Sequence, residues 1–316
     1  MDNELNDKIR ASIIGYAIGD TLGKGTEFMT KPTVRLRYPH GLRTFGGIIR
    51  DAHRSQWAPN EWTNDTEILL LMARTMTEAQ SLDIHSQAAM LKKWYESHIY
   101  EVGSTLRWVL SQEDYLDDPH GAVARVWGRM VTLEANNEAL GRVMLAGMWP
   151  GDEYARKATD ICRLTHCDQR CVSTARIIAE VAHSLLWDNE TPDFDTLASM
   201  SHDTDERTLP YVEAARQRGI DQLELDDPET FWYARKTMAC ALWALWHCGS
   251  MEEALYKIVD EGGDADTNAA LALGLLGLRY GSKALPEYLQ GELLNRDRLE
   301  QTADALSTLF LSQKNA

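Results

Sequence analysis

The six residues 262–267 contain two glycines, two aspartates and a threonine, directly before an apolar run over residues 269–278. Glycine lets the backbone turn tightly, and a run rich in alanine and leucine is typical of a buried helix. Such a turn brings the oxygens of Asp264, Asp266 and Thr267 to one place. Carboxylate and hydroxyl oxygens are the ligands that Mg²⁺ and Mn²⁺ prefer. The alternative interpretation is that Asp264 or Thr267 only caps the N-terminus of this helix.

A second cluster of oxygen-bearing side chains stands at residues 63–65, before the apolar stretch 68–76. Taken alone, this cluster too is explained by helix capping. Because both clusters precede a helix with an apolar face, we expect them to share one centre. Together with water, their oxygens suffice for two octahedral metal ions. The predicted ligands are Thr63, Asn64, Asp65, Asp264, Asp266 and Thr267.

A third acidic side chain, Glu27, lies in a glycine-rich stretch that follows the apolar segment 9–18. A carboxylate in such a stretch is suited to act as a general acid or base, or as a metal ligand that moves. In isolation, the same residue would be interpreted as an ordinary surface glutamate.

The spacing of apolar residues predicts an all-α fold. Apolar side chains recur at intervals of three and four residues along segments 9–18, 68–76, 88–94, 172–186, 238–246 and 271–278. No segment alternates convincingly as a half-buried strand does, and no repeat or linker divides the chain. We therefore predict a single domain over residues 1–316, a compact orthogonal bundle of about a dozen helices around a binuclear metal centre.

Small residues recur on one face of two predicted helices. The first series is Ala11, Gly15 and Gly19, and the second is Ala270, Gly274 and Gly277. Stacked small residues let two helix axes approach closely. Because a glycine inside a helix costs roughly 1 kcal/mol relative to alanine, we expect tight packing to offset that cost.

Three segments lack a clear helical spacing and are predicted to be loops or lids: residues 23–53, 112–121 and 201–229. The last of them is expected to include a helix over residues 211–218. Long irregular segments in a compact domain are often functional, although many are only surface.

Charge and hydropathy exclude two classes of partner. The chain has 48 acidic and 32 basic residues and a net charge of −16, so extended nucleic-acid binding is not expected. The apolar runs are too short to span a bilayer, and residues 1–10 lack the apolar region of a signal peptide. We therefore expect a cytoplasmic protein that does not enter the membrane.

The five cysteines are expected to be free thiols, because their number is odd and no export signal is present. A zinc site at Cys162, His166, Cys167 and Cys171 is disfavoured, since no Cys-x-x-Cys pair occurs. The spacing of these four residues instead suits consecutive turns of one helix.

Four stretches of the chain carry a family resemblance. Residues 15–23 read GYAIGDTLG and are followed by Glu27, residues 62–66 read WTNDT, residues 236–243 read KTMACALW, and residues 263–267 read GDADT. These motifs resemble those of the ADP-ribosylglycohydrolases, an all-α family with a binuclear magnesium or manganese centre. The resemblance covers roughly residues 9–281, and the GDADT match is its most specific part.

The resemblance implies a role for each matching residue. The implied metal ligands are Thr63, Asp65, Asp264, Asp266 and Thr267, with Asn64 at the place of an aspartate. The implied catalytic carboxylates are Glu27, Asp65 and Glu101. The implied substrate-binding residues are Gly103, Asn137 and His166.

Three residues depart from the family pattern. Asn64 keeps an oxygen ligand but lacks the charge of aspartate, so we expect one of the two ions to bind more weakly. Glu138 replaces the glycine of an N-G-x-x-M-R loop, which adds bulk and negative charge where backbone N–H groups would approach a phosphate. Glu101 is one methylene longer than the family aspartate, which alters the leaving-group geometry.

The predicted function is metal-dependent hydrolysis of the glycosidic bond of an ADP-ribosyl group, with ADP-ribosyl-arginine on a protein as the expected substrate. Two Mg²⁺ or Mn²⁺ ions are the implied cofactors. The implied partner is an ADP-ribosylated protein or an ADP-ribose-like small molecule. Two alternatives stay open: hydrolysis of a simpler riboside, which Glu138 favours, and an inactive ligand-binding protein, which Asn64 favours. The sequence carries no signal for the oligomeric state.

Overall fold

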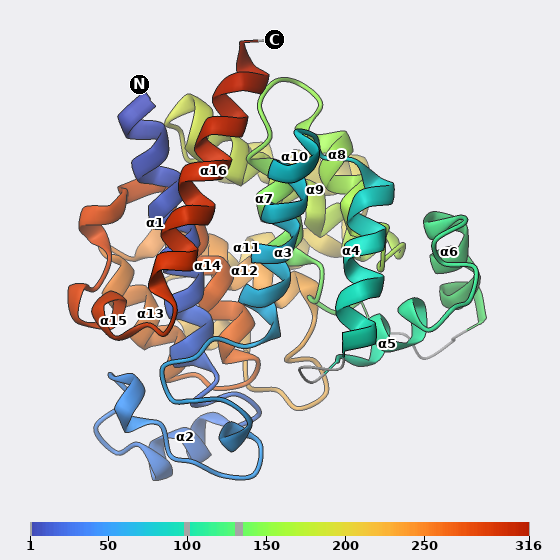
Figure 1. Ribbon diagram of the computed structural model, residues 1–316. Helices are drawn as coiled ribbons and strands as arrows, with labels where there is room; N and C mark the ends of the chain where they lie inside the picture. The colour runs from blue at the N-terminus through green and yellow to red at the C-terminus, as the bar shows by residue number, and fades with distance from the viewer. Residues whose placement is uncertain (1, 98–101, 130–134, 316) are drawn as a thin grey trace.

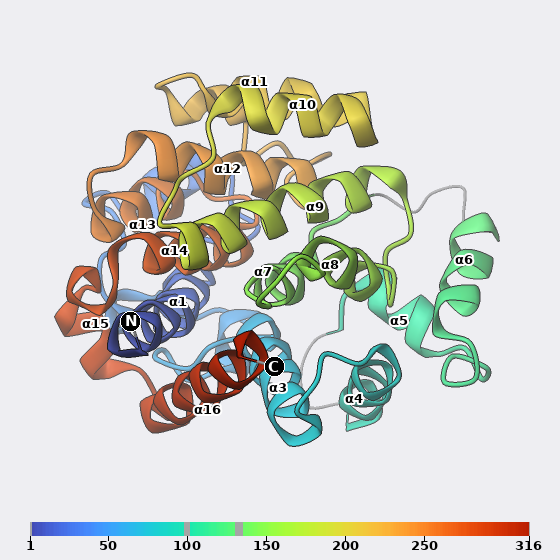
Figure 2. The same ribbon diagram turned by 90° about the horizontal axis from the view of Figure 1, so that it is seen from above.

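Two helices lie side by side through the centre of the fold: α1 (Asp2–Gly23) and α14 (Ala265–Tyr280) (Figure 1, Figure 2). The computed structural model describes residues 2–97, 102–129 and 135–315. Within these residues the structure is helical, with no β-strand and one isolated β-bridge, between Asn136 and Tyr233. The prediction of an all-α fold is therefore confirmed.

The other helices surround this central pair. They are α2 (Lys31–Arg37), α3 (Asn64–Ala79), α4 (Ile84–Ser97), α5 (Ser104–Leu110), α6 (Pro119–Arg129), α7 (Leu140–Gly147), α8 (Tyr154–Cys162), α9 (Gln169–His183), α10 (Phe194–Thr204), α11 (Leu209–Ala215), α12 (Ala234–His247), α13 (Met251–Val259), α15 (Glu287–Glu292) and α16 (Arg296–Lys314). Helices α3, α7, α12, α13 and α16 contact the pair directly, whereas α6 and α10 lie at the periphery (Figure 2). None of the helices in these described ranges is long and apolar enough to cross a lipid bilayer.

Glycines allow α1 and α14 to touch at the backbone. A Cβ atom on Gly19 would lie 2.4 Å from the carbonyl carbon of Ala269, and one on Gly23 would lie 2.4 Å from Cα of Asp266. Gly277 makes the equivalent approach from α14, where a Cβ atom would lie 2.5 Å from the backbone of α1. Because no side chain fits at such distances, only glycine permits this packing. The expected role of the small-residue spacing is therefore confirmed.

Helix α14 is buried along almost its whole length. Every residue from Ala265 to Leu278 is buried, including the polar side chains of Asp266, Thr267 and Asn268. Burying a polar or charged side chain is unfavourable unless it finds a partner. The first turn of α14 is therefore the part of the core that needs a chemical explanation.

Short helices occupy parts of the segments predicted to be loops. Residues 23–53 contain α2, and residues 201–229 contain α11. Helix α11 begins before the predicted residue 211, because Pro210 stands in its first turn, where the N–H that proline lacks is not needed.

The prediction that Cys162, His166, Cys167 and Cys171 lie on one helix is wrong. Helix α8 ends at Cys162, and α9 begins directly after Asp168, whose side chain caps it. A turn therefore separates the first cysteine from the last, which the cysteine spacing alone did not indicate. All five cysteines are free thiols, as expected.

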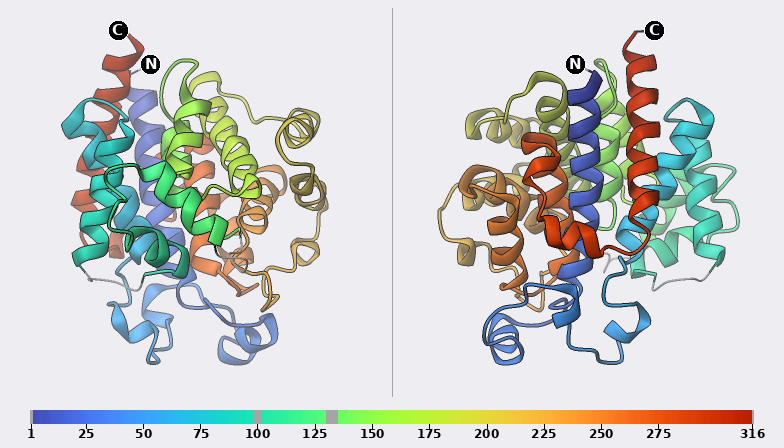
Figure 3. Two further views of the ribbon diagram at one scale, coloured as in Figure 1. Left: turned by 90° about the vertical axis from the view of Figure 1, so that its right-hand side faces the viewer. Right: turned by 60° about the vertical axis from the view of Figure 1, so that its left-hand side comes forward.

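Three helix ends meet at one end of the bundle. They are the C-terminal end of α1 and the N-terminal ends of α3 and α14. The chain between α1 and α3, residues 24–63, folds over this end and carries α2 (Figure 1, Figure 3). This arrangement gathers the oxygen-rich segments of the sequence under one cover.

We predict that Gly19→Ala lowers the free energy of unfolding by about 2 kcal/mol or more, because the new methyl group would press on the backbone of α14. Urea denaturation measures this change. Gly128→Ala is the matched control, since Gly128 is an exposed residue of α6 and no atom of the described residues lies within 4 Å of its Cβ position. This control is expected to raise stability, by up to about 1 kcal/mol. Equal effects of the two substitutions would contradict the backbone contact.

Candidate functional site

Backbone hydrogen bonds hold the loop after α1 against the turn before α14. Phe28 N donates to Gly263 O over 2.7 Å, and Gly263 N donates to Met29 O over 2.8 Å. Gly262 and Gly263 have φ angles of +78° and +67°, and a Cβ atom on Gly263 would lie 1.9 Å from the carbonyl oxygen of Leu225. Both the conformation and the close approach therefore require glycine at this turn.

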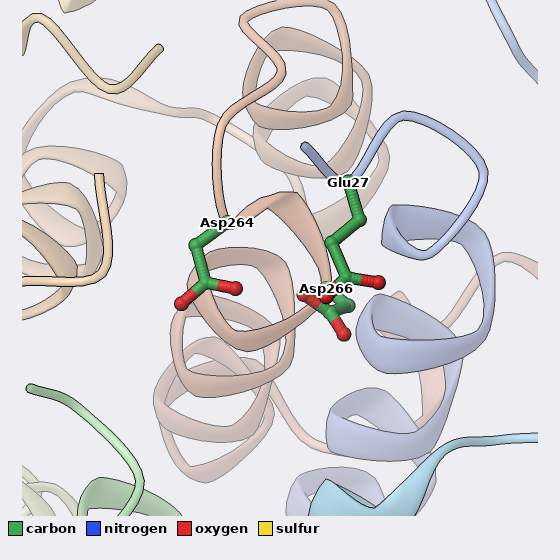
Figure 4. Close-up of side chains that lie close together, drawn as sticks. All are labelled: Glu27, Asp264 and Asp266. Carbon is green, nitrogen blue, oxygen red and sulfur yellow. The ribbon is translucent and has the colours of Figure 1, made fainter. Parts of the chain in front are cut away.

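Three carboxylates meet where these two segments join (Figure 4). One oxygen of each of Glu27, Asp264 and Asp266 lies within 4.8 Å of the others, and all three residues are buried. Glu27 comes from the loop after α1, whereas the two aspartates stand at the start of α14. Carboxylates at this distance repel one another unless they are protonated or share a cation.

The second predicted cluster reaches the first through Asp65. Thr267 Oγ1 donates to Asp65 Oδ2 over 2.8 Å, which links the first turn of α14 to that of α3. Thr63 caps α3, and its hydroxyl accepts from Asp65 N over 3.3 Å. Thr63, Asn64 and Asp65 line the same cavity as the two aspartates of α14. Thr63 therefore caps α3 and also lines the cavity of the acidic centre, so the two interpretations of its cluster do not exclude each other.

Asp20 supports this arrangement from inside α1, a role that the sequence analysis missed. Its buried carboxylate accepts from Thr63 N over 3.0 Å, from Thr66 N over 3.0 Å and from Thr66 Oγ1 over 2.6 Å. It therefore satisfies donors at the N-terminus of α3 and fixes the turn that carries Asp65. The only sequence signal was an aspartate inside an otherwise apolar, glycine-bearing helix.

Burial shifts the protonation of the carboxylates in this centre. It raises the pKa of Asp65 and Asp266 well above the usual range, and repulsion from Asp20 and Glu27, respectively, adds to the shift. Burial also raises the pKa of Glu27 to about 7, although a hydrogen bond from His53 opposes this. Metal-free, the centre therefore resists carrying its full negative charge.

The donor set fits a divalent cation. Oδ1 of Asp266 is buried and has no hydrogen-bond partner among the described residues. A buried lysine, Lys24, directs its ammonium group to the carbonyl oxygens of Ala58 and Glu61 instead. A site of hard oxygen donors with an orphaned carboxylate oxygen is what Mg²⁺ or Mn²⁺ requires. The residues able to hold such ions are Glu27, Thr63, Asn64, Asp65, Asp264, Asp266 and Thr267.

A cavity of about 380 Å³ opens above these oxygens. We call the oxygen-donor side of this cavity its floor; it consists of Glu27, Thr63, Asn64, Asp65, Asp264, Asp266 and Thr267. Its remaining lining comes from the loops before α3, α5, α7 and α12: residues Phe28, His53, Trp57, Gly103, Ser104, Thr105, Asn136, Asn137, Glu138, Phe231 and Trp232. The volume suits a small organic ligand.

One wall of the cavity is aromatic, and it includes Phe231, one of three adjacent aromatic residues whose sequence is compatible both with core packing and with stacking on a base. The Phe28 ring lies 5.1 Å from that of His53 and 5.8 Å from that of Phe231, measured between centroids. Phe28 has a φ of +60° and 56% of its surface exposed. A bulky residue in this conformation is strained, and such strain is commonly found at functional sites.

Asn137 and Gly103, both predicted to bind substrate, lie at the cavity. The Asn137 amide donates to Asp264 Oδ2, and also to Thr237 Oγ1 over 2.8 Å. Asn137 therefore orients a carboxylate of the acidic centre from the loop before α7. Gly103 stands beside the carboxylate of Glu138, which leaves no room for a side chain there.

His166 lies behind the cavity rather than in its lining. Arg142 Nη2 donates to Thr165 Oγ1 over 2.7 Å, Thr165 Oγ1 is bonded to His166 Nδ1 over 2.7 Å, and His166 Nε2 is bonded to Asn136 Oδ1. Burial lowers the pKa of His166 to about 3, so the ring is neutral. The structure therefore places His166 where it positions Asn136, and any contact with substrate would be indirect. Glu101 lies outside the described residues.

Comparison with known proteins decides the family. The sequence model of the ADP-ribosylglycohydrolase family matches residues 1–316. The chain belongs to the ADP-ribosylglycohydrolase family. It is therefore a glycosidic-bond hydrolase, and the resemblance recognised in its motifs is confirmed.

Named relatives agree with this assignment. The chain is 24% identical over 315 residues to the ADP-ribosylarginine hydrolase Tri1 of Serratia proteamaculans (strain 568), which covers 96% of this chain and 80% of the relative. It is 25% identical over 296 residues to the ADP-ribosyl-[dinitrogen reductase] glycohydrolase of Rhodospirillum rubrum, covering 89% of this chain and 88% of the relative. A solved ADP-ribosylglycohydrolase-related protein complex superposes with a TM-score of 0.76 and 26% identity, covering 98% and 99% of the two chains.

We predict opposite effects of Asp266→Asn on the metal-free and metal-loaded protein. In EDTA the variant should melt at or above the wild-type temperature, because one buried negative charge is gone. Excess Mg²⁺ or Mn²⁺ should raise the free energy of unfolding of the wild type, by about 2.7 kcal/mol when the metal is at 100 times its dissociation constant. The variant should lose much of this metal-dependent stabilisation. Thermal unfolding measures both effects, and Asp203→Asn, at an exposed position, is the control. An equal metal-dependent gain in wild type and variant would contradict the assignment of Asp266.

Proposed function

We propose that the protein removes ADP-ribose from ADP-ribosyl-arginine on a protein, in a reaction that requires two Mg²⁺ or Mn²⁺ ions. The observation that carries this proposal is the buried oxygen-donor centre on the floor of a cavity of about 380 Å³. The names of the Serratia and Rhodospirillum relatives support the substrate. Both names describe removal of an ADP-ribosyl group, and one of them specifies arginine.

The chain supplies the metal ligands from two helix starts and one loop. Thr63, Asn64 and Asp65 at α3 would hold the ions together with Asp264, Asp266 and Thr267 at α14. When bound, the ions would supply Lewis-acid polarisation of the ribose hydroxyls and of a water molecule. Asn137 keeps Asp264 in place through its amide, and Asp20 keeps the turn of Asp65 in place. This pre-set geometry removes the need to reorganise charged groups during the reaction.

Glu27 is the carboxylate that we assign to proton transfer. Its Oε2 is hydrogen-bonded to His53 Nε2 over 2.8 Å, and the side chain lines the cavity beside Asp266. In the proposed reaction, a water oxygen bonds to the anomeric carbon while the bond from that carbon to the arginine nitrogen breaks. The bonding electrons leave with the nitrogen, and Glu27 takes a proton from the water and passes it to the departing nitrogen.

Glu138 favours a second candidate function. Its carboxylate lines the cavity, where it adds negative charge. A substrate without a diphosphate, such as a simpler riboside, would avoid repulsion from this group. A panel of nucleosides beside ADP-ribosyl-arginine separates the two candidates, because each predicts a different preferred substrate.

We predict that the purified protein releases ADP-ribose from a mono-ADP-ribosylated arginine protein in Mg²⁺ or Mn²⁺ but not in EDTA. Asp266→Ala should lower the rate at least about 100-fold. Loss of a residue that only supports a metal ligand already costs up to about 100-fold, and Asp266 is proposed to be a ligand itself. Chromatography of released ADP-ribose measures the rate. Release that persists in EDTA would contradict metal dependence, and no release from a protein that binds two metal ions would point to the riboside candidate.

Asn64→Asp is expected to tighten metal binding, because it adds a charged oxygen to the ligand set at the start of α3. The metal concentration for half-maximal activity should fall roughly tenfold, as ligand charge sets affinity at such sites. Asn315→Asp adds the same charge at an exposed position and should change nothing. If the half-maximal concentration rises or stays constant in Asn64→Asp, Asn64 does not contact a metal ion.

A further inference from the structure

Glu138 is held at the cavity by a small number of contacts. Its Oε2 accepts from Leu106 N over 3.2 Å, and its Oε1 lies against Gly103, 1.5 Å from where a Cβ atom would stand. Oε1 accepts no hydrogen bond of 3.5 Å or less within the described ranges of the chain, although the nearby Asn136 side chain favours the charged form of this carboxyl and opposes the rise in its pKa. The side chain is only 18% exposed, and the exposed part faces the cavity that it lines. One oxygen of a largely buried carboxylate is therefore open to a ligand.

No lysine or arginine among the residues that the structure describes forms an ion pair with Glu138, although the positive charge of the buried Arg142 acts on this carboxyl and opposes the rise in its pKa. Neither lysine nor arginine lines the cavity in the described part of the chain, and residues 1, 98–101, 130–134 and 316 include neither type. The nearest histidine nitrogen, His166 Nε2, lies 3.8 Å from Oε2 and belongs to a neutral ring. Arg142 is buried behind Asn137, and the hydrogen bond of its guanidinium goes to Thr165.

A buried carboxylate that lacks an ion-pair partner has lost its hydration without full compensation. A cationic group on a ligand would supply that compensation. A planar guanidinium suits it best, because its forked N–H donors match carboxylate oxygens. An anionic group at this wall would instead be repelled by Glu138, because no lysine or arginine among the described residues lines the cavity to offset that charge. The contacts of Glu138 therefore favour binding of a cationic ligand group by this carboxylate. They favour it over a role in which Glu138 only repels phosphate.

We infer that Glu138 is a specificity-determining residue that receives the guanidinium of the arginine from which ADP-ribose is removed. This inference rests on the proposed function and deepens it, because it states which wall of the cavity holds the arginine side. The ribose then lies between that wall and the acidic floor. The aromatic wall of Phe28, His53 and Phe231 is left for the remainder of the ADP-ribosyl group.

Binding of two small probes to the metal-loaded, full-length protein tests the inference. Glu138→Gln preserves the size of the side chain and an oxygen acceptor for Leu106 N, while it removes the charge. We expect this variant to bind methylguanidinium about tenfold or more weakly than wild type, because it lacks one partner of a buried charge pair. We expect its affinity for ADP, which carries a diphosphate and no guanidinium, to change by less than about threefold. Calorimetric titration measures both affinities.

A kinetic measurement adds a readout that a merely structural role would not move. With ADP-ribosyl-arginine, Glu138→Gln should raise KM more than it lowers kcat, since Glu138 holds the departing group without entering the proton transfer. Glu229→Gln is the matched control: Glu229 is exposed, stands near Phe231 in the sequence and does not line the cavity. Its loss of one charge should leave both probe affinities unchanged.

The outcomes separate this inference from the proposed function. Absence of methylguanidinium binding in wild type, or equal binding in Glu138→Gln, would overturn the inference. A variant that gains about tenfold in ADP affinity while its methylguanidinium affinity is unchanged would show that Glu138 only repels phosphate. Weakened methylguanidinium binding in a protein that does not hydrolyse ADP-ribosyl-arginine would support the assigned wall and reject the proposed substrate.

Discussion

The backbone contact between α1 and α14 is the constraint on which the site depends. Gly19 and Gly23 let α1 lie directly against the first turn of α14, so that Asp266 faces the end of α1. The loop that follows Gly23 then pairs with Gly263, and this pairing sets Glu27 beside Asp266. Larger residues on α1 would insert a layer of side chains between the helices, and the acidic groups could not converge in the core.

Convergence of buried carboxylates is unfavourable, and the fold compensates it in two different ways. Asp20 accepts hydrogen bonds from Thr63 and Thr66, and these bonds oppose the rise that burial causes in its pKa. Asp266 retains an unpartnered oxygen, and burial with neighbouring charges raises its pKa. The N-terminal ends of α3 and α14 contribute partial positive charge, which is too small to balance the group. The number of hydrogen-bond donors around the carboxylate thus distinguishes Asp20, which has a structural role, from Asp266, which is a proposed metal ligand.

Local patterns explain why much of this molecule could be predicted from sequence. The helical spacing around residues 9–18 and 271–278 and the oxygen-rich starts of α3 and α14 are short-range features, and each of them occurs in the structure. The role of Asp20, the place of Phe28 in the aromatic wall and the burial of His166 could not be predicted, because each depends on a segment distant in sequence. The break between α8 and α9 was missed because a cap at Asp168 outweighed the regular spacing of the cysteines.

The sequence by itself determined the fold class and the family and indicated the candidate oxygen donors, since these follow from helical periodicity and short motifs. Only the tertiary structure decided how the donors are used. It joined Asp65 to Thr267, placed His166 behind Asn136, and left Glu138 at the cavity without an ion pair to a lysine or arginine among the described residues. The physical reason is that the desolvation of a charged group depends on all the atoms around it, and most of those atoms come from remote parts of the chain.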